Sequence, residues 1–252
     1  MSSSLALVCA LAIFSLNYDS CHSSVDKSLP LIPASLPAGY SRLVRPHAGG
    51  PPLEVSLSFY IINIELEDHR MHAVLYRRAI WNDPRLKNER GITLTYRADD
   101  VLPHIWVPDL FYPNVVEPSK LINTGFVRIS GSGEVTHSQM AKETFTCPGA
   151  KLGFSLFLLP QLECSIEIES YGFSTEDIIF KPKAPADSSI SIGETAVTSE
   201  FYRLINSTAT ERNIVLSTGT YSRVHFSLVF ENTLKNAPKG SVVALFESLR
   251  RS

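Results

Sequence analysis

The strongest constraint on the fold of this 252-residue chain is a period of two in its apolar residues. Apolar side chains occupy every second position in short segments, which turn-forming residues separate. This period places alternate side chains on opposite faces of a β-strand, whereas a helix needs a period near 3.6. Many short strands with frequent turns and little helical periodicity predict an all-β protein with a β-sandwich architecture.

The individual strands can be read from the same pattern. Alternate residues are apolar from Val55 to Ile61 in one series and from Tyr60 to Leu66 in the other, which predicts a strand buried on both faces. A turn at 67–69 leads to a strand at 71–81, where Tyr76 and Arg78 share one face. The list of further expected strands comprises 126–130 and 134–139, joined as a hairpin through Gly131-Ser132-Gly133, then 164–170, 178–180 and 224–230.

Composition excludes several classes of protein. Hydrophobic residues make up 44% of the chain, enough for a packed core, so a wholly disordered chain is excluded. The 23 Lys and Arg nearly balance the 25 Asp and Glu, and a net charge of −2 argues against binding to nucleic acid or to an anionic membrane surface. No uninterrupted apolar run is long enough to predict a transmembrane helix.

The chain divides into four expected regions. Residues 1–22 are read as a signal peptide because Leu5–Leu16 is an apolar stretch too short to span a bilayer. No Lys or Arg precedes that stretch, so a buried N-terminal helix is the alternative. We expect a Pro-rich lead-in with at most one short helix at 23–53, the sandwich at 54–231, and a polar tail without a transmembrane segment at 232–252.

The four cysteines fit a secreted protein. Cys9 lies in the expected signal peptide and Cys21 at its edge, which leaves Cys147 and Cys164 to form a disulfide in an oxidising compartment. The alternative is two free, buried thiols. Asn206 begins the sequence Asn-Ser-Thr, a glycosylation site typical of an exposed loop.

An enzyme is the least favoured class. The chain contains neither a G-x-S-x-G nor an H-E-x-x-H motif, and no paired carboxylates follow an apolar strand. His104, His137 and His225 are scattered, and we expect them at the surface. The two remaining cysteines have no neighbouring Cys/His set for zinc. We therefore predict no catalytic residue, no metal site and no cofactor.

Several motifs go beyond fold class because they resemble one family in order along the chain. They are Gly39–Pro46, the W-x-D-x-R-L of Trp81–Leu86, the W-x-P-D of Ile105–Phe111, the V-R-I-x-x-x-G-x-V of Val127–Val135, Cys164–Ile178 and Ser217–Arg223. Together they resemble the extracellular ligand-binding domain of Cys-loop (pentameric) ligand-gated ion channels. The likeness is greatest to the GABA, glycine and glutamate receptors, and above all to GABA receptor beta-type subunits. It implies a twisted ten-strand sandwich, assembled in a ring of usually five, with the agonist between neighbouring subunits.

The resemblance also implies which residues form the principal face of such a site. They are Phe111 at the family's loop A position, Glu169, Ser170 and Tyr171 at loop B, and Thr218 and Tyr221 at loop C. In beta-type GABA subunits these positions carry an acidic residue and tyrosines that hold the ligand's amine. Here the two tyrosines would stack on an ammonium group and Glu169 would pair with its charge. For isolated tyrosines, packing within the sandwich would be the simpler reading.

The complementary face would come from the neighbouring subunit. The resemblance places Tyr76 as its aromatic residue and Arg78 as the cation for the ligand's carboxylate, for which a guanidinium suits bidentate pairing. We expect Arg77, the next residue, to be solvated. Lys142 stands where the family often has a small hydroxyl residue, and either adds a second cation or blocks the pocket. Met140 is expected to serve packing.

Two departures from the family shape the functional hypothesis. The 16 residues between Cys147 and Cys164 exceed the family's thirteen-residue loop, and Phe157–Pro160 replaces its F-P-x-D core. The polar stretch after Phe230 stands where the family begins a membrane helix. Both suggest a soluble, secreted form without its own pore, comparable in architecture to molluscan acetylcholine-binding proteins. A truncated transcript would explain the tail equally well.

Two functions follow as alternatives. In the first, the protein binds an amino-acid or amine transmitter at an interface within its own ring. In the second, it is a ligand-blind subunit that assembles with full-length receptor subunits and modulates them, which would place it at the cell surface through its partners. Lys142 and the altered disulfide loop favour the second alternative.

Overall fold

The structure is a computed structural model that describes residues 36–232, except 68, 118, 149–160 and 198–201. Two compact units are distinguished, Met1–Ala38 and Gly39–Ser252, and the fold described below belongs to the second. The expected signal peptide, the tip of the disulfide loop and the tail from 233 onward lie outside the described residues. Residues 36–52, the described part of the lead-in, form turns and bends and contain no helix.

Nearly all the regular secondary structure of the described residues is β-strand. Ten strands have three residues or more, as the resemblance implies, and β4 and β5 add two pieces of two residues each. Three single turns of helix connect them, η1 (Pro84–Leu86), α2 (Ala98–Val101) and η2 (Ala186–Ser188). The strands are β1 (Leu53–Glu67), β2 (Arg70–Asn82), β3 (Leu94–Arg97), β4 (Leu110–Phe111), β5 (Lys120–Leu121), β6 (Phe126–Ile129), β7 (Glu134–Thr146), β8 (Gln161–Ser170), β9 (Ile178–Pro182), β10 (Ile190–Ile192), β11 (Tyr202–Leu216) and β12 (Gly219–Asn232).

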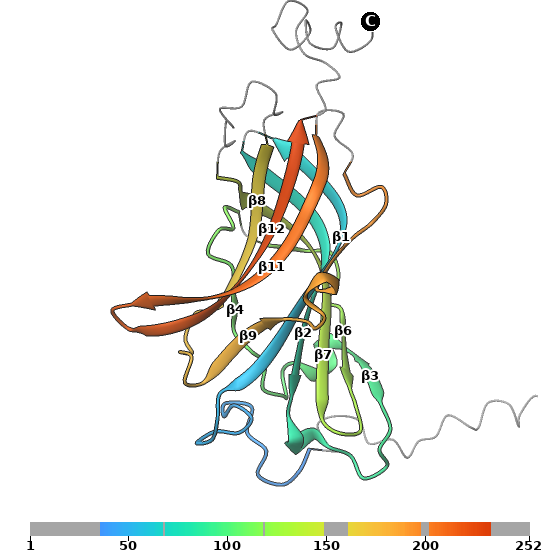
Figure 1. The fold of residues 1–252 in the computed structure, drawn as a ribbon. Coiled ribbons are helices and arrows are strands. Elements are labelled where there is room, and N and C mark those ends of the chain that lie inside the picture. Colours follow the sequence, from blue (N-terminus) through green and yellow to red (C-terminus); the bar gives the residue numbers. More distant parts are fainter. Residues whose placement is uncertain (1–35, 68, 118, 149–160, 198–201, 233–252) are drawn as a thin grey trace, which may run out of the picture. The chain divides into compact units, whose positions relative to one another are not determined.

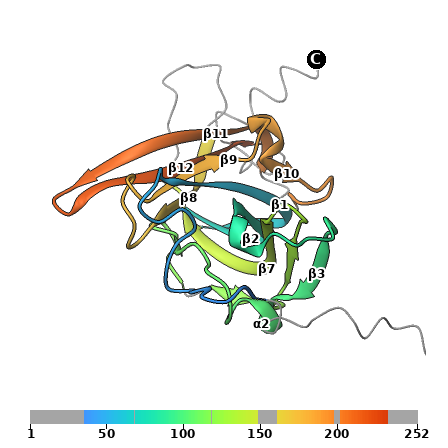
Figure 2. The same cartoon turned by 90° about the horizontal axis from the view of Figure 1, so that it is seen from below.

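The strands form two sheets that pack as the predicted sandwich. The larger sheet has the order β10-β1-β2-β7-β6-β3, with β5 paired to β7 and β9 paired to β1. The smaller sheet has the order β11-β12-β8-β4. Figure 1 shows both sheets, and in Figure 2 the strands β8, β11 and β12 lie over β1, β2 and β7. The β11–β12 hairpin reaches beyond the other strands as an arm.

The core lies between the facing surfaces of the two sheets. Phe59 of β1 meets Phe226 of β12 edge to face, with 5.0 Å between the ring centroids. Alternate residues of the central strands β2, β8 and β12 are fully buried around this pair, because each strand turns one face inward. Burial of this apolar surface stabilises the fold at about 25 cal/mol per Å².

The expectation that β1 is buried on both faces is wrong. Leu53, Val55, Leu57 and Phe59 are buried, but Tyr60 on the other face is exposed, because the second sheet covers only one side. A bulge between Ile61 and Asn63 then changes which residues face the core.

Most of the predicted strand positions are confirmed. The hairpin through Gly131-Ser132-Gly133 forms as expected, and β7 continues beyond it to Thr146. The long strand β11 was missed: its polar side chains show little alternation, since it is an edge strand that faces solvent over most of its length. Asn206 is exposed, but on this strand rather than in a loop.

The two family motifs Trp81–Leu86 and Ile105–Phe111 meet at one end of the sandwich. Asp83 is fully buried there and accepts two hydrogen bonds from the Arg85 guanidinium, at 2.7 and 2.8 Å. Tyr40 donates to the same carboxylate at 2.9 Å and accepts from the Trp106 amide at 3.0 Å. Burial, more than any charge, raises the pKa of Tyr40 to about 12. The motifs therefore close the end of the sandwich.

The opposite end is closed by the predicted disulfide, which is confirmed. Cys147 directly follows β7 and Cys164 lies in β8, with 4.4 Å between their Cα atoms. Since β7 and β8 belong to different sheets, the bridge joins the two layers. The Cys147 amide also donates to the carbonyl of His69 in the β1–β2 turn, at 2.7 Å.

Candidate functional site

Two of the expected principal-face rings are exposed and touch each other. Phe111 lies on β4, which pairs with the end of β8, and Tyr171 follows directly after β8. Their ring centroids are 5.5 Å apart in an edge arrangement, and the residues are 38% and 77% exposed. Large apolar surface at this exposure is available to a ligand or a partner, so packing within the sandwich does not account for these rings.

The third ring, Tyr221, lies near the tip of the β11–β12 hairpin. Arg223 stands opposite Glu169, so Tyr221 lies on β12 two residues beyond that pair, in the direction of Tyr171. The half-buried Tyr221 donates a hydrogen bond from its hydroxyl to that of Thr218, at 3.0 Å. Tyr221 is thereby held to the turn of the arm.

The polar residues of the principal face already have partners within the chain. Glu169 is buried and accepts a hydrogen bond from Nε of Arg223 at 2.9 Å, and Nη2 of the same guanidinium lies 2.8 Å from the same carboxylate oxygen. Ser170 is also buried and donates to Asp109 at 2.6 Å while accepting from the Phe173 amide. Arg223 and Asp109 were missed by sequence reasoning, although Arg223 lies two residues after Tyr221 on the same face.

The expected complementary face lies on the larger sheet. Tyr76 and Arg78 of β2 border a groove of about 480 Å³, whose other wall consists of Met140, Ser138 and the segment 123–126. The Arg78 guanidinium lies 6.0 Å from the centre of the Tyr76 ring. Lys142 is exposed on β7, two residues beyond Met140 and opposite Lys120, and it does not border the groove.

The two sets of residues lie on opposite outer surfaces of the sandwich. Tyr76 and Arg78 alternate with the core residues Leu75 and Ala79 of the larger sheet, and therefore point outward from it. Glu169 likewise alternates with Ile168 in the smaller sheet. A single copy of the domain thus cannot bring its own aromatic group and Arg78 together around one small molecule.

The comparison with known families agrees with this architecture. The family described as the neurotransmitter-gated ion-channel ligand binding domain matches residues 32–233 of the chain. The chain belongs to this family. The match covers both sheets and every residue of the two surfaces, and it confirms the resemblance drawn from the sequence motifs.

A curated relative is similar over most of this ligand-binding domain. It is a "gamma-aminobutyric acid receptor subunit beta-like" protein of Drosophila melanogaster, 27% identical over 219 residues. The alignment takes in 78% of this chain and 42% of the relative, so the chain spans less than half of that protein's length. Within the described part of the chain, no helix has the length and apolar character that crossing a membrane requires.

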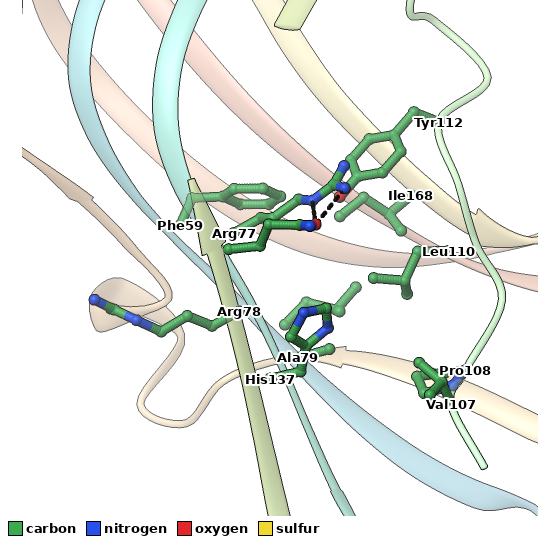
Figure 3. Close-up of a pocket in the computed structure, with 12 residues that line it drawn as sticks. Phe59, Arg77, Arg78, Ala79, Val107, Pro108, Leu110, Tyr112, His137 and Ile168 are labelled. Atoms are coloured by element: carbon green, nitrogen blue, oxygen red, sulfur yellow. Dashed lines mark hydrogen bonds between the residues drawn. The ribbon is translucent and has the colours of Figure 1, made fainter. Parts of the chain in front are cut away.

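The expectation that Arg77 of this ligand-binding domain is solvated is wrong. Its side chain lies between the sheets and is only 20% exposed, because β2 turns odd-numbered residues toward the core. It donates to Glu143 at 3.0 Å and to Gln139 at 2.6 Å, and lies 5.6 Å from the centre of the Tyr112 ring. Figure 3 shows Arg77 beside Tyr112 and Arg78 pointing away from both.

Two of the three histidines also differ from expectation. His137 lies on the core-facing side of β7 and the Nε2 atom is buried, while His225 is half-buried on β12; only His104 is exposed. Burial, and then the charge of Arg77, lower the pKa of His137 to about 4. His137 and Gln139 lie on the same strand face as the buried residues Val135 and Ala141, and this spacing in the sequence would have indicated the placement. Across the described ranges, no group of His, Cys, Asp and Glu residues is arranged to hold a metal ion.

Proposed function

We propose that this domain binds a small amine or amino-acid transmitter between two adjacent subunits. One subunit contributes Phe111, Tyr171 and Tyr221, and its neighbour contributes Tyr76 and Arg78. The observation that carries the proposal is that these aromatic and cationic groups lie on opposite outer surfaces of one copy, with Phe111 and Tyr171 exposed and the other three half-buried. Head-to-tail contact between identical copies brings two such surfaces together, and closes into a ring.

The chemistry of the two surfaces suits a zwitterion. Electron-rich rings attract an ammonium group, with about 0.5 to 2 kcal/mol per contact. The Arg78 guanidinium suits a carboxylate. Glu169 contributes a negative charge near the rings, and its ion pair with Arg223 fixes the position of its side chain. A GABA-, glycine- or glutamate-like molecule carries both charges, and the similarity to a GABA receptor beta-like protein supports this class.

The proposal includes an extracellular setting and ring assembly, usually of five copies in this family. The disulfide between the sheets supports an oxidising compartment. The exposed Asn206 is open to a glycan. The signal peptide and the polar tail lie outside the described residues and remain part of the proposal.

Calorimetric titration with GABA, glycine, glutamate and biogenic amines tests this function. We expect Tyr221→Ala and Arg78→Ala each to raise the dissociation constant of the transmitter about ten-fold or more. Tyr202→Ala and Arg203→Ala on β11 are matched controls away from both surfaces, and should leave binding unchanged. Absence of binding to every member of the panel by the assembled protein would refute the proposal.

The second candidate is a ligand-blind subunit that joins full-length receptor subunits. It is favoured by the ion pair of Glu169 with Arg223, which also pairs with Glu167, because a ligand ammonium would have to compete with that guanidinium for the Glu169 carboxylate. Co-purification with a full-length subunit, together with no heat of binding for any transmitter, supports this candidate over the first.

A further inference from the structure

A cavity of about 160 Å³ lies inside the sandwich, within one copy of the domain. Arg78 borders both this cavity and the groove of the complementary face, which share no other lining residue. The cavity opens between the larger sheet and the segment 107–112, which leads into β4. Most of its wall is apolar. The apolar residues that line it are Leu57, Phe59, Ala79, Val107, Pro108, Leu110 and Ile168.

Two buried polar atoms in this wall have no hydrogen-bond partner among the described residues. They are the hydroxyl oxygen of Tyr112 and Nε2 of His137. Buried polar atoms in folded proteins are nearly always paired, with protein or with ordered water. In Figure 3 both rings border the same space, with Leu110 and Ile168 between them. The cavity therefore combines apolar walls with two unused hydrogen-bonding atoms.

Neither arginine in the wall presents a free charge to the cavity, because the Arg78 side chain extends away from it (Figure 3) and Arg77 is paired. The Arg77 guanidinium beside it is ion-paired with Glu143 and hydrogen-bonded to Gln139. Burial raises the pKa of Tyr112 above its usual value, with a smaller opposing effect of Arg77, so its hydroxyl stays protonated at neutral pH. His137 is neutral at the same pH because its pKa lies at about 4. A charged ligand would have no counterion here, whereas an uncharged one would suit the site.

We propose that this cavity is a second binding site, for a small uncharged molecule of benzene size that carries one hydroxyl group. The volume matches that of protein cavities known to bind benzene, about 150 Å³. The ligand hydroxyl accepts from the Tyr112 hydroxyl and donates to Nε2 of His137, and its ring packs against the apolar wall. The site needs only one subunit, and Arg78 is the one lining residue that it shares with the interface proposed above.

Phenol is the probe that tests this site, with benzene as its analogue without a hydroxyl. We expect phenol to bind the full chain with a dissociation constant on the order of 1 mM, as measured by NMR titration. Tyr112→Phe should lower the affinity for phenol about five-fold and leave the affinity for benzene unchanged, since it removes one hydrogen bond and keeps the ring. Ala79→Val, which narrows the cavity, should lower the affinity for both ligands.

The interface variant Tyr221→Ala is the control that separates the two sites. It should leave phenol binding unchanged, even in a preparation that binds no transmitter. The inference is overturned if phenol shifts no resonance of the cavity residues, as expected for a cavity that holds water alone. It is also overturned if folded Tyr112→Phe and Ala79→Val variants, checked by circular dichroism, bind phenol as well as the unaltered protein.

Discussion

At the scale of single residues, Arg77 and Arg78 show how one position along a strand changes the role of a side chain. They are chemically identical neighbours on β2, yet Arg77 lies between the sheets and Arg78 on the outer surface. Arg77 meets Glu143, whose side chain is only 1% exposed, while Arg78 borders the groove of the complementary face. One arginine therefore contributes to the stability of the fold and the other is available for binding.

Replacing each arginine with methionine should separate these roles. Arg77→Met leaves the buried Glu143 carboxylate without its counterion, and we expect the free energy of unfolding to fall by about 3 kcal/mol. Arg78→Met should change it by less than about 0.5 kcal/mol. Urea denaturation followed by fluorescence measures both. Equal losses for the two variants would contradict the assignment.

His137 makes the stability of the domain depend on pH. Its pKa is lowered to about 4 in the fold against an ordinary value of 6.5, so the fold favours the neutral imidazole. Its contribution is fully present above pH 6.5 and is lost as pH falls toward 4, because the unfolded chain takes up the proton first. The loss amounts to about 3 kcal/mol over this window.

The variant His137→Gln, which cannot titrate, should show a flatter pH dependence of its unfolding free energy between pH 6.5 and 4. The pKa of His225 is also lowered, first by burial and then by Arg212, so the difference between the variant and the unaltered protein is the quantity to measure. His104→Gln, at an exposed position, is the matched control. Parallel curves for His137→Gln and the unaltered protein would disprove the buried, neutral state of His137.

Sequence reasoning placed Tyr171, Phe111 and Tyr76 on accessible surfaces because a family motif positioned them. The structure leaves Tyr171 and Phe111 exposed and Tyr76 half-buried on the outer face of β2. It failed for Arg77 and His137 because polar residues are rarely expected on the core-facing side of a strand. Their burial depends on partners from other strands, Glu143 and Tyr112 among them, and a single sequence does not show which strands become neighbours.

At the scale of elements, the Trp81–Leu86 motif connects the end of β2 to the segment around Trp106 through the Tyr40 hydroxyl. Asp83 is 0% exposed and receives hydrogen bonds from Arg85 and Tyr40. Gly133 of the β6–β7 hairpin packs against the same residue, and a Cβ there would lie 2.4 Å from the Asp83 carbonyl oxygen. With its φ of +92°, this position requires glycine on both counts.

Asp83→Ala should lower the free energy of unfolding by about 3 kcal/mol, because it leaves the Arg85 guanidinium and the Tyr40 hydroxyl without their acceptor. Thermal and urea unfolding both report this loss. Glu231→Gln, which alters an exposed ion pair with Arg203, is the control and should cost less than about 0.5 kcal/mol. A loss for Asp83→Ala no greater than for this control would mean that the cluster does not stabilise the end of the sandwich.

The sequence pattern predicted the strands β8 and β12, which pack against the other sheet, but did not predict the edge strand β11. β8 and β12 alternate apolar and polar residues because one face is buried. β11 has only one neighbouring strand and faces solvent, so its sequence has little need of alternation. Its pairing with β12 over fifteen residues comes from the hairpin turn and backbone hydrogen bonds, which leave little trace in residue type.

At the scale of the whole assembly, the separation of the two surfaces predicts complementation between defective subunits. Tyr221→Ala and Arg78→Ala subunits should each bind transmitter poorly on their own. When the two are co-expressed and mix at random within rings, about one quarter of the interfaces should carry two intact surfaces, because each surface is intact in half the subunits.

Calorimetry on the mixed rings measures that recovered fraction, and light scattering confirms that rings have formed. Tyr221→Ala mixed with a Tyr171→Ala subunit is the control, since both changes fall on the same surface and no intact interface can arise. No recovery in the first mixture, or equal recovery in both, would place the site within one subunit.

The Cys147–Cys164 bridge joins the two layers covalently, at the end of the sandwich opposite the Asp83 cluster. Once the bridge is reduced, the layers are held near the other end by noncovalent contacts, such as the hydrogen bonds between Ser222 of β12 and Phe180 of β9. Amide hydrogens at the C-terminal end of β7 and in β8 should then exchange with solvent faster, while those near Asn82 keep their protection.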